Sequence, residues 1–404
     1  MATTATRRLA LLGSTGSIGR QAVDVVARAG GRLRITALAA GRDVDALASQ
    51  AASLAPAAIA LERPDDPAAA ERRLRDAAPR ARVYVGEGAS ARMVRDLDVD
   101  VVLNGIVGSA GLEASLVTLE RGMRLALANK ETLVVGGPLV RAALARGGEL
   151  LPVDSEHSAA LQCLGGRPPS EVAKLVLTAS GGPLRTHTDW RRATREEVLA
   201  HPVWSMGARI TVDSALMFNK GLEMIEAHAL FDLDWHQLDA VLHPEAKLHA
   251  WASFIDGSTV VQAAPPDMAL PIQLALSWPE RWPGAVAPVT ALDLAGCTLA
   301  PIPTDRYPAF GLAVAAGKAG GTAPCALNAA DEVAVQAFLA GAIGIAGVVD
   351  VIARVMDEHA REDVESLEQL RGVDAWARER AHAAIERPGG PRSGGPRPAS
   401  ALRA

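Results

Sequence analysis

The sequence predicts an α/β protein with an N-terminal domain built on a parallel sheet, an α+β domain that carries the chemistry, and a small C-terminal helical domain. The chain has 404 residues, which corresponds to two or three domains at ~150 residues each. Short apolar segments alternate with helical patterns in the first half, as in βαβ units. Thirteen of the 14 aromatic residues follow residue 189, so the first half must build its core from aliphatic side chains.

The expected elements follow in order along the chain. Strands are expected at residues 8–12, 33–40, 82–85, 99–104 and 125–128, with a glycine loop at 13–19 and an amphipathic helix at 21–29. The expected units are a dinucleotide-binding domain (1–150), a catalytic domain (151–277), a proline-rich linker (278–308), a helical domain (309–386) and a disordered tail (387–404).

Composition excludes several classes of protein. Hydrophobic residues make up 49%, charged residues 22%, and the net charge is −5, which is typical of a globular protein and not of a disordered chain or a basic nucleic-acid binder. No stretch reaches the ~18 apolar residues of a membrane span, and the short apolar run from Leu9 to Leu12 favours a strand over a secretion signal. Three widely spaced cysteines indicate a reducing cytoplasm.

A glycine loop, Gly13-Ser14-Thr15-Gly16-Ser17-Ile18-Gly19, lies between the first strand and the first helix. Its glycines allow a tight turn and a close approach of backbone N–H groups to a pyrophosphate at the helix N-terminus. The strand–loop–helix–strand context favours a Rossmann-type dinucleotide site over a purely structural turn.

The end of the second strand bears on which dinucleotide is bound. An NAD site expects an acidic residue ~20 residues after the loop, whereas here Gly41-Arg42-Asp43 follows the strand. Arg42 suits the 2′-phosphate of NADP, while Asp43 weakens that interpretation. On position alone, a solvated turn explains the pair equally well.

Asp154 and Glu156 form a candidate metal site. In an extended chain, residues i and i+2 face the same way, and two carboxylates suit a hard cation such as Mg²⁺ or Mn²⁺. A solvated strand edge is the more common explanation of such a pair. His157 is expected on the opposite face, in a structural role.

A denser polar cluster runs from His201 to Glu226. Asp213 or Ser214 is a plausible N-cap for a helix that ends near Leu230. Asn219 and Glu223 then share a face, with Lys220 beside them. Glu226 lies near the same face, so spacing alone does not decide which glutamate binds a ligand, and an amphipathic helix with a Lys–Glu pair is the structural alternative. The loop Ser180-Gly181-Gly182-Pro183 could hold a phosphate or form an ordinary turn.

Taken together and in this order, these segments resemble the 1-deoxy-D-xylulose-5-phosphate reductoisomerase family. The resemblance rests on LGSTGSIG, ANKE (128–131), PVDSEH, SGGP, HPVWSMG, VDSALMFNKGLEMIEA, PDM (266–268) and ALNAADE, and it covers residues 9–386. It implies NADPH and a divalent metal (Mg²⁺ or Mn²⁺, with Co²⁺ as a further candidate), a sugar-phosphate substrate, a homodimer, and no nucleic-acid or membrane partner.

The resemblance also implies a role for each matching residue. The cofactor residues are Thr15, Gly16, Ser17, Ile18, Gly41, Arg42, Asp43, Asn129, Glu131 and Gly207. The metal ligands are Asp154, Glu156 and Glu223, which are also catalytic together with Lys130. The substrate residues are Lys130, Ser155, Glu156, Ser180, His201, Ser214, Asn219, Lys220 and Glu223, and Trp204 and Met206 belong to a flexible lid.

The implied chemistry is a retro-aldol and aldol rearrangement of 1-deoxy-D-xylulose 5-phosphate, followed by hydride transfer from NADPH. Two other functions remain as alternatives: a catalytically silent NADP-sensing relative, or an oxidoreductase for another sugar phosphate. Three motifs depart from the usual family pattern. Asp43 ends the adenosine-end motif, Asp331 stands where Asn is usual, and Ala208-Arg209 stands where two basic residues are common.

Overall fold

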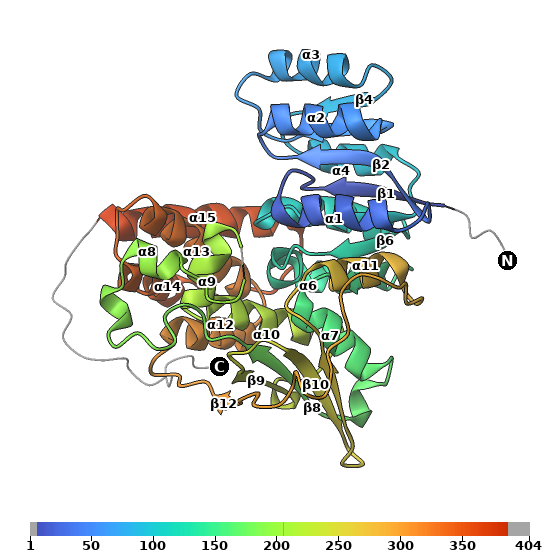
Figure 1. Cartoon of the computed structure of the whole chain (residues 1–404). Helices are drawn as coiled ribbons and strands as arrows, with labels where there is room; N and C mark the ends of the chain where they lie inside the picture. The colour runs from blue at the N-terminus through green and yellow to red at the C-terminus, as the bar shows by residue number, and fades with distance from the viewer. Residues whose placement is uncertain (1–5, 205, 387–404) are drawn as a thin grey trace.

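A computed structural model describes residues 6–204 and 206–386, so the expected disordered tail (387–404) lies outside the described residues. The N-terminal part is a seven-stranded sheet in the order β4-β3-β2-β1-β5-β6-β7, in which every pairing is parallel. Its strands are β1 (Arg7–Leu12), β2 (Leu33–Ala40), β3 (Ala58–Leu61), β4 (Arg82–Val85), β5 (Val101–Asn104), β6 (Arg124–Leu127) and β7 (Glu149–Pro152). The predicted α/β class is confirmed (Figure 1).

Helices cover both faces of this sheet, because both faces of its strands are apolar. They are α1 (Ser17–Arg28), α2 (Val44–Leu54), α3 (Pro67–Ala77), α4 (Ala89–Asp96), α5 (Leu112–Glu120) and α6 (Glu131–Leu144). Leu9 and Leu11 face one core, and Ala10 and Leu12 face the other. Helix α1 begins at Ser17, inside the glycine loop, which is earlier than the predicted residue 21.

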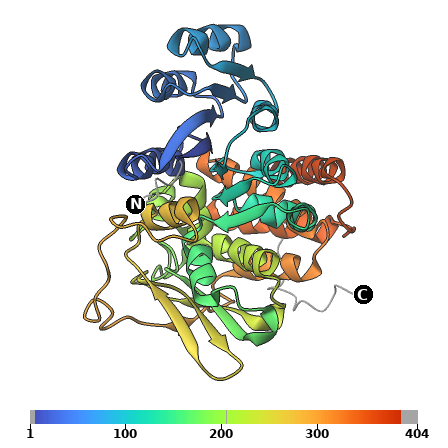
Figure 2. The same cartoon turned by 90° about the vertical axis from the view of Figure 1, so that its right-hand side faces the viewer.

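A second, five-stranded sheet has the order β11-β10-β8-β9-β12. Its strands are β8 (Val172–Ala179), β9 (Leu238–Leu242), β10 (Leu248–Phe254), β11 (Thr259–Ala263) and β12 (Ala300–Pro301). Only the β8–β9 pairing is parallel among these described strands. Helix α7 (Ser155–Leu164) packs on β10. The hairpin of β10 and β11 extends away from the body, in yellow at the bottom of Figure 2.

The remaining helices join the two sheets to the C-terminal part. They are α8 (Arg195–Leu199), α9 (Ala208–Ala215), α10 (Phe218–Phe231), α11 (Ala269–Ser277), α12 (Pro308–Ala319), α13 (Ala323–Leu339), α14 (Ile345–Glu358) and α15 (Leu367–Glu386). Helices α9 and α10 share one apolar core with α12 to α15. Helix α11 returns to the parallel sheet, where its apolar residues join the core of α1. Within the described residues, no helix is long and apolar enough to cross a membrane.

The predicted single helix from Asp213 or Ser214 to Leu230 is wrong. Asp213 and Ser214 lie inside α9, and the chain breaks at Met217, which has a φ of 57° and precedes α10. Gly221 then lets α10 approach α12 closely, since a Cβ atom at this position would lie 2.4 Å from the Ala313 Cβ. The break at Met217 separates α9 from α10, the helix that carries Asn219, Lys220 and Glu223.

Candidate active site

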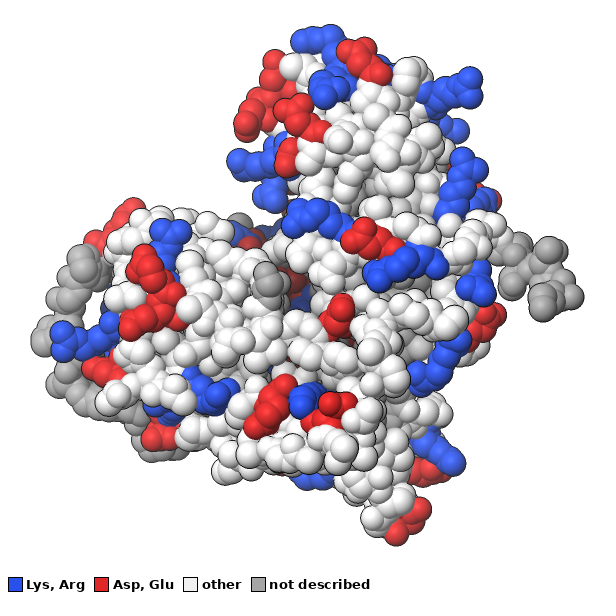
Figure 3. Space-filling view, in the orientation of Figure 1, with Lys and Arg blue, Asp and Glu red and all other residues white. Residues whose placement is uncertain are grey.

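A cavity of about 670 Å³ lies between the parallel-sheet domain and the rest of the chain. Figure 3 shows a recess at this boundary, with acidic and basic atoms inside it. The predicted site residues that line it are Gly16, Ser17, Ile18, Asn129, Lys130, Glu131, Asp154, Ser155, Glu156, Ser180, His201, Trp204, Met206, Gly207, Ser214, Asn219, Lys220 and Glu223. Thr15, Gly41, Arg42 and Asp43 are described residues that do not line it.

Three carboxylates converge in this cavity. One oxygen each from Asp154, Glu156 and Glu223 lies within 4.8 Å of the others. Asp154 does not lie in an extended segment, as the sequence analysis expected. It is the N-cap of α7 and accepts hydrogen bonds from the backbone N–H groups of Glu156 and His157. Capping places Asp154 and Glu156 on the same turn, so they meet for a reason other than strand alternation.

Two lysines lie among these carboxylates. Lys130 donates to Asp154 and, at 3.1 Å, to Glu223 Oε1. Lys220 contacts Glu156 Oε1 at 3.0 Å and also pairs with Glu223. Burial raises the pKa of Glu223, and the neighbouring Glu156 raises it further. Burial alone would lower the pKa of Lys130, but Asp154 and Glu223 raise it well above its usual value. Two ammonium groups against three carboxylates leave one negative charge, which suits a bound cation.

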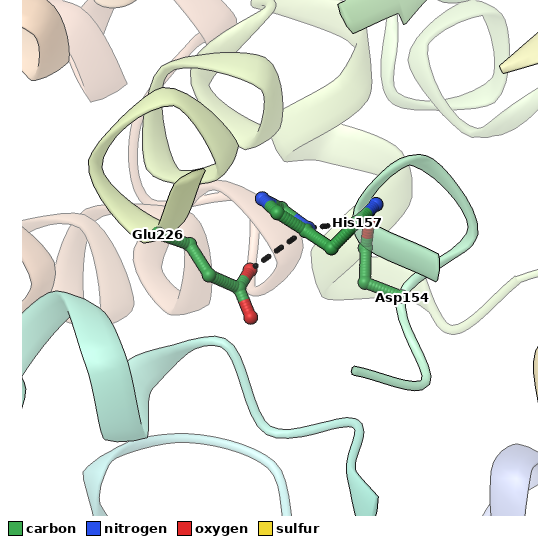
Figure 4. Close-up of side chains that lie close together, drawn as sticks. All are labelled: Asp154, His157 and Glu226. Carbon is green, nitrogen blue, oxygen red and sulfur yellow. Dashed lines mark hydrogen bonds and ion pairs between the residues drawn. The ribbon is translucent and has the colours of Figure 1, made fainter. Parts of the chain in front are cut away.

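His157 lies between the carboxylates of Asp154 and Glu226 (Figure 4). His157 is completely buried. Its Nδ1 lies 2.8 Å from Asp154 Oδ1 and 3.4 Å from Glu226 Oε2, while its Nε2 lies 2.9 Å from the carbonyl oxygen of Glu223. Both nitrogens therefore face acceptors. Burial alone would lower the pKa of His157, but Glu226 and Asp154 raise it to about 9, which makes the ring cationic at neutral pH.

The two glutamates left open by spacing thus have different surroundings. Glu223 points to Asp154 and Glu156, whereas Glu226 points to His157. Asn219 donates to Glu223 Oε1 at 2.6 Å, so the predicted shared helix face is confirmed.

The opposite end of the cavity offers neutral donors. His201 Nδ1 accepts from the backbone N–H groups of Val203 and Trp204 at 3.2 and 2.9 Å, and its Nε2 lies 3.2 Å from Ser180 Oγ. Burial lowers the pKa of His201, which keeps the imidazole neutral, with its proton on Nε2. Gly182 packs closely on the backbone of Ser214. A Cβ atom at position 182 would lie 2.3 Å from the Ser214 carbonyl oxygen, so glycine is needed there. This contact brings the SGGP loop and Ser214 together.

The glycine loop forms the dinucleotide end. Gly13 has a φ of +76°, and a Cβ there would lie 2.5 Å from the Gly105 oxygen, so only glycine fits. No side chain caps α1, which leaves its first N–H groups available for an anion. Because β1 and β2 are parallel neighbours, residues 41–43 and this loop both follow the carboxyl ends of adjacent strands. Asp43 caps α2 by accepting from the Ala46 N–H at 2.9 Å.

Sequence profiles of one family match most of the chain. The profile for 1-deoxy-D-xylulose 5-phosphate reductoisomerase matches residues 9–137, and its two C-terminal domain profiles match residues 150–231 and 263–380. The reductoisomerase of Beutenbergia cavernae is 48% identical over 389 residues, which are 94% of this chain and 97% of the relative. The chain belongs to the 1-deoxy-D-xylulose 5-phosphate reductoisomerase family.

Other members of this reductoisomerase family also match the chain over most of its length. The Mycobacterium tuberculosis protein is 47% identical, with 94% of this chain and 90% of the relative covered. A crystal structure of DOX-P reductoisomerase in complex with NADPH, fosmidomycin and magnesium has a TM-score of 0.89 and 35% identity, and the match covers 94% of this chain and 98% of that one. The Zymomonas mobilis enzyme in complex with NADPH has a TM-score of 0.85 and 33% identity, with coverages of 95% and 99%.

Sequence reasoning missed several residues of the reductoisomerase cavity. His249, Arg209 and Asp213 line it. His157, expected on the face opposite Asp154, instead contacts Asp154, and Glu226 pairs with His157. His249 comes from β10 and is distant from every motif, so no local pattern could identify it. Asp213 and Glu226 were visible as acidic residues, but only the packing of α9 and α10 shows where each carboxylate points.

Proposed function

We infer that this chain converts 1-deoxy-D-xylulose 5-phosphate into 2-C-methyl-D-erythritol 4-phosphate, with NADPH and a divalent metal, in non-mevalonate isoprenoid precursor biosynthesis. One observation carries this inference. A single cavity combines three convergent carboxylates, a neutral Ser180–His201 pair and a glycine loop at a helix N-terminus. A silent NADP-sensing relative has no use for the intact carboxylate and lysine cluster, and the substrate-end residues match the reductoisomerase pattern.

The residues fit a hard divalent cation. Asp154, Glu156 and Glu223 supply oxygen ligands within reach of one ion, and their one-charge excess over the two lysines favours a cation. When bound, Mg²⁺ or Mn²⁺ supplies Lewis acidity toward the substrate oxygens, and NADPH supplies the hydride. Lys130 and Ser155 hold the hydroxyl and carbonyl end of the substrate, where Lys130 can also move a proton.

The neutral end of the cavity holds the phosphate. Ser180 accepts from the Gly182 N–H at 3.2 Å and lies against the protonated Nε2 of His201, so its own hydroxyl proton remains available for an anion. Ser214 completes this end, and Asn219 and Lys220, which also contact the carboxylates, lie where it meets the metal site.

For the cofactor, we propose that residues 15–18 hold the NADPH phosphates, with Asn129, Glu131 and Gly207 along its nicotinamide half. Residues 41–43 approach the adenosine half. Arg42 is exposed just after the carboxyl end of β2, and its guanidinium suits a 2′-phosphate. Asp43 caps α2 but keeps its negative charge, so it softens the preference for NADPH that Arg42 supports.

We propose that Trp204 and Met206 form a lid over the substrate. Both line the cavity, and the segment around them has no regular structure in its described residues. A closed lid excludes water from reactive intermediates. Tryptophan emission of the wild type should change when substrate or a phosphonate inhibitor binds. A Trp204→Phe variant that keeps the full change in emission would contradict the placement of Trp204 in the lid.

The decisive experiment for the proposed function is a turnover assay. Purified chain loaded with Mn²⁺ should oxidise NADPH only after 1-deoxy-D-xylulose 5-phosphate is added, as followed by absorbance. A folded, metal-loaded sample without turnover would refute the assignment. Turnover with a different ketose phosphate at equal efficiency would favour the alternative oxidoreductase.

We also propose a homodimer in the cytoplasm. Strand β11 is an edge strand that exposes 45% of Val260 and 49% of Val261, and Ile255 in the adjoining turn is 70% exposed. An apolar sheet edge of this kind suits pairing with a second copy. All three cysteines are free, which fits a reducing compartment. Light scattering on the purified chain should give twice the 42.0 kDa mass, and Val261→Lys should shift it toward one copy.

A further inference from the structure

Arg209 lies at the centre of a buried acidic cluster between the lid and the C-terminal helices. It is the second residue of α9, two positions after Gly207, and only 15% of its side chain is exposed. Its guanidinium contacts Glu131 Oε1 at 2.9 Å, Glu332 Oε1 at 3.2 Å, Asn328 Oδ1 at 3.3 Å, Asp331 Oδ2 at 3.4 Å and Asp213 Oδ2 at 3.9 Å. One side chain thus joins α6, α9 and α13.

The contact with Glu131 leads directly to the cofactor end of the cavity. Glu131 accepts from the Gly108 N–H at 3.1 Å through the same oxygen that Arg209 contacts. Its other oxygen accepts from Asn129 Nδ2 at 2.9 Å. Asn129, Glu131 and Gly207 all line the cavity. The Arg209 guanidinium therefore helps to fix the Glu131 carboxylate, which in turn bonds Asn129.

Acidic groups outnumber basic ones in this cluster. Glu131, Asp213, Asp331 and Glu332 surround Arg209, while Arg378 pairs with Glu332 at 2.5 Å and with Asp374 at 2.6 Å. Burial raises the pKa of Asp213 to about 7, and burial together with Asp213 raises the pKa of Asp331 well above its usual value. The Oδ1 atoms of both aspartates are buried without a hydrogen-bond partner in the described structure.

Only a guanidinium can reach all of these acceptors. Arg presents five N–H donors in a planar fork, whereas Lys presents a compact charge with three donors. Asp331 on α13 is one of these acceptors, with its Oδ2 3.4 Å from Arg209 Nη2.

We propose that Arg209 is a positioning residue that holds the Glu131 carboxylate at the cofactor end of the cavity, with Asp331 as one of its partners on α13. This inference rests on the proposed NADPH site. Arg209 links the cofactor end of the cavity to the C-terminal helices, because the same guanidinium contacts Glu131 on one side and Asn328 of α13 on the other. Its effect is therefore on cofactor binding rather than on the substrate phosphate end.

The test compares Arg209→Lys, the double variant Arg209→Lys/Asp331→Asn, and the control Arg371→Lys, which alters an exposed ion pair with Glu113. The dissociation constant for NADPH is measured by cofactor fluorescence, without substrate, and KM is measured for both substrates. Arg209→Lys should weaken NADPH binding about tenfold, the loss expected for a charge-assisted hydrogen bond, with the sugar-phosphate KM within twofold of the wild type.

Asp331→Asn in the Arg209→Lys background should restore most of the NADPH affinity, because the Asn amide supplies donors of its own and leaves more of the three lysine donors to Glu131. Arg371→Lys should match the wild type. Unchanged NADPH affinity in Arg209→Lys would overturn the positioning role, and absence of rescue would overturn the pairing with Asp331. Equal loss of affinity for both substrates would show general disruption and also overturn the inference. A wild-type chain that binds no NADPH would instead overturn the proposed function on which it rests.

Discussion

His157 offers a direct test of how the carboxylate cluster is organised. It contacts two of the three proposed metal ligands, through the Asp154 side chain and the Glu223 backbone. Replacement by Gln removes the cation and one of the two contacts. It also leaves Glu226 buried without a charged partner in the described structure, since its Oε2 faces the His157 ring. The double variant His157→Gln/Glu226→Gln removes that second problem and isolates the loss of positioning.

The magnitude follows from the bonds that remain. Asp154 Oδ1 keeps its two backbone donors at 3.1 and 3.3 Å and loses the imidazole donor at 2.8 Å. Loss of a group that orients a metal ligand weakens metal affinity by about 10- to 100-fold. Because two of the three donors to Asp154 Oδ1 persist, and Lys130 still donates to Oδ2, we expect a loss near the middle of that range, about 30-fold, for the double variant. His157→Gln alone should also unfold more easily, because it removes the cationic partner of the buried Glu226 carboxyl, whose pKa burial already raises to about 7.

Titration with Mn²⁺, followed by the electron paramagnetic resonance of the free ion, measures this affinity without turnover. Thermal unfolding of the same samples separates affinity from stability. The matched control is His228→Gln on α10, because His228 bonds the Leu233 carbonyl at 2.7 Å and has no hydrogen bond to any of the three carboxylates. Its Mn²⁺ affinity should stay within twofold of the wild type. A double variant that binds Mn²⁺ as tightly as the wild type would refute the role assigned to His157.

Three further predictions follow from the same geometry. Glu156→Gln should nearly abolish turnover while NADPH binding persists, because a charged oxygen ligand is lost; retained activity would contradict the metal site. Asp43→Asn keeps the α2 cap but removes ~1 kcal/mol of repulsion near a 2′-phosphate. The ratio of kcat/KM for NADPH to kcat/KM for NADH should therefore rise about fivefold. Asp43→Ala also removes the cap and should cost ~1 kcal/mol of stability. The folded-state pKa of Asp213 is raised from 3.8 to about 7, so the stability it contributes is lost as pH rises from 4 through 7. Asp213→Asn should therefore raise the unfolding free energy at pH 8, by up to about 4 kcal/mol, with little change at pH 4; a pH-independent effect in urea titrations would contradict this.

Much of the parallel-sheet domain was predictable because its strands are continuous aliphatic runs between turn residues. Residues 33–40 and 82–85 form strands with the expected bounds. Strand β3 was missed because Ala58–Leu61 is a four-residue segment with two alanines, which helices accept equally well. Strand β7 was missed because it is a short edge strand that ends in proline.

The site was predictable where residues that are close in sequence also act together. Asn219 and Glu223 meet because four residues make about one helical turn. Prediction failed where distant segments supply the partner. Nothing near His157 in the sequence indicates that its Nε2 faces the backbone of Glu223, 66 residues away. Arg209 likewise meets Asp331 only because α9 packs on α13.

The return of α11 to the parallel sheet limits where the chain can be divided. Ala269, Ile272 and Leu276 are buried in the same core as β1 and α1. Arg7 and Arg124 also reach across to carbonyl groups at residues 276 and 278, at 2.9 and 2.8 Å. A fragment that ends at residue 150 would expose this apolar surface and aggregate. A dinucleotide-binding fragment suitable for independent expression should therefore carry residues 269–278 on a short engineered connection.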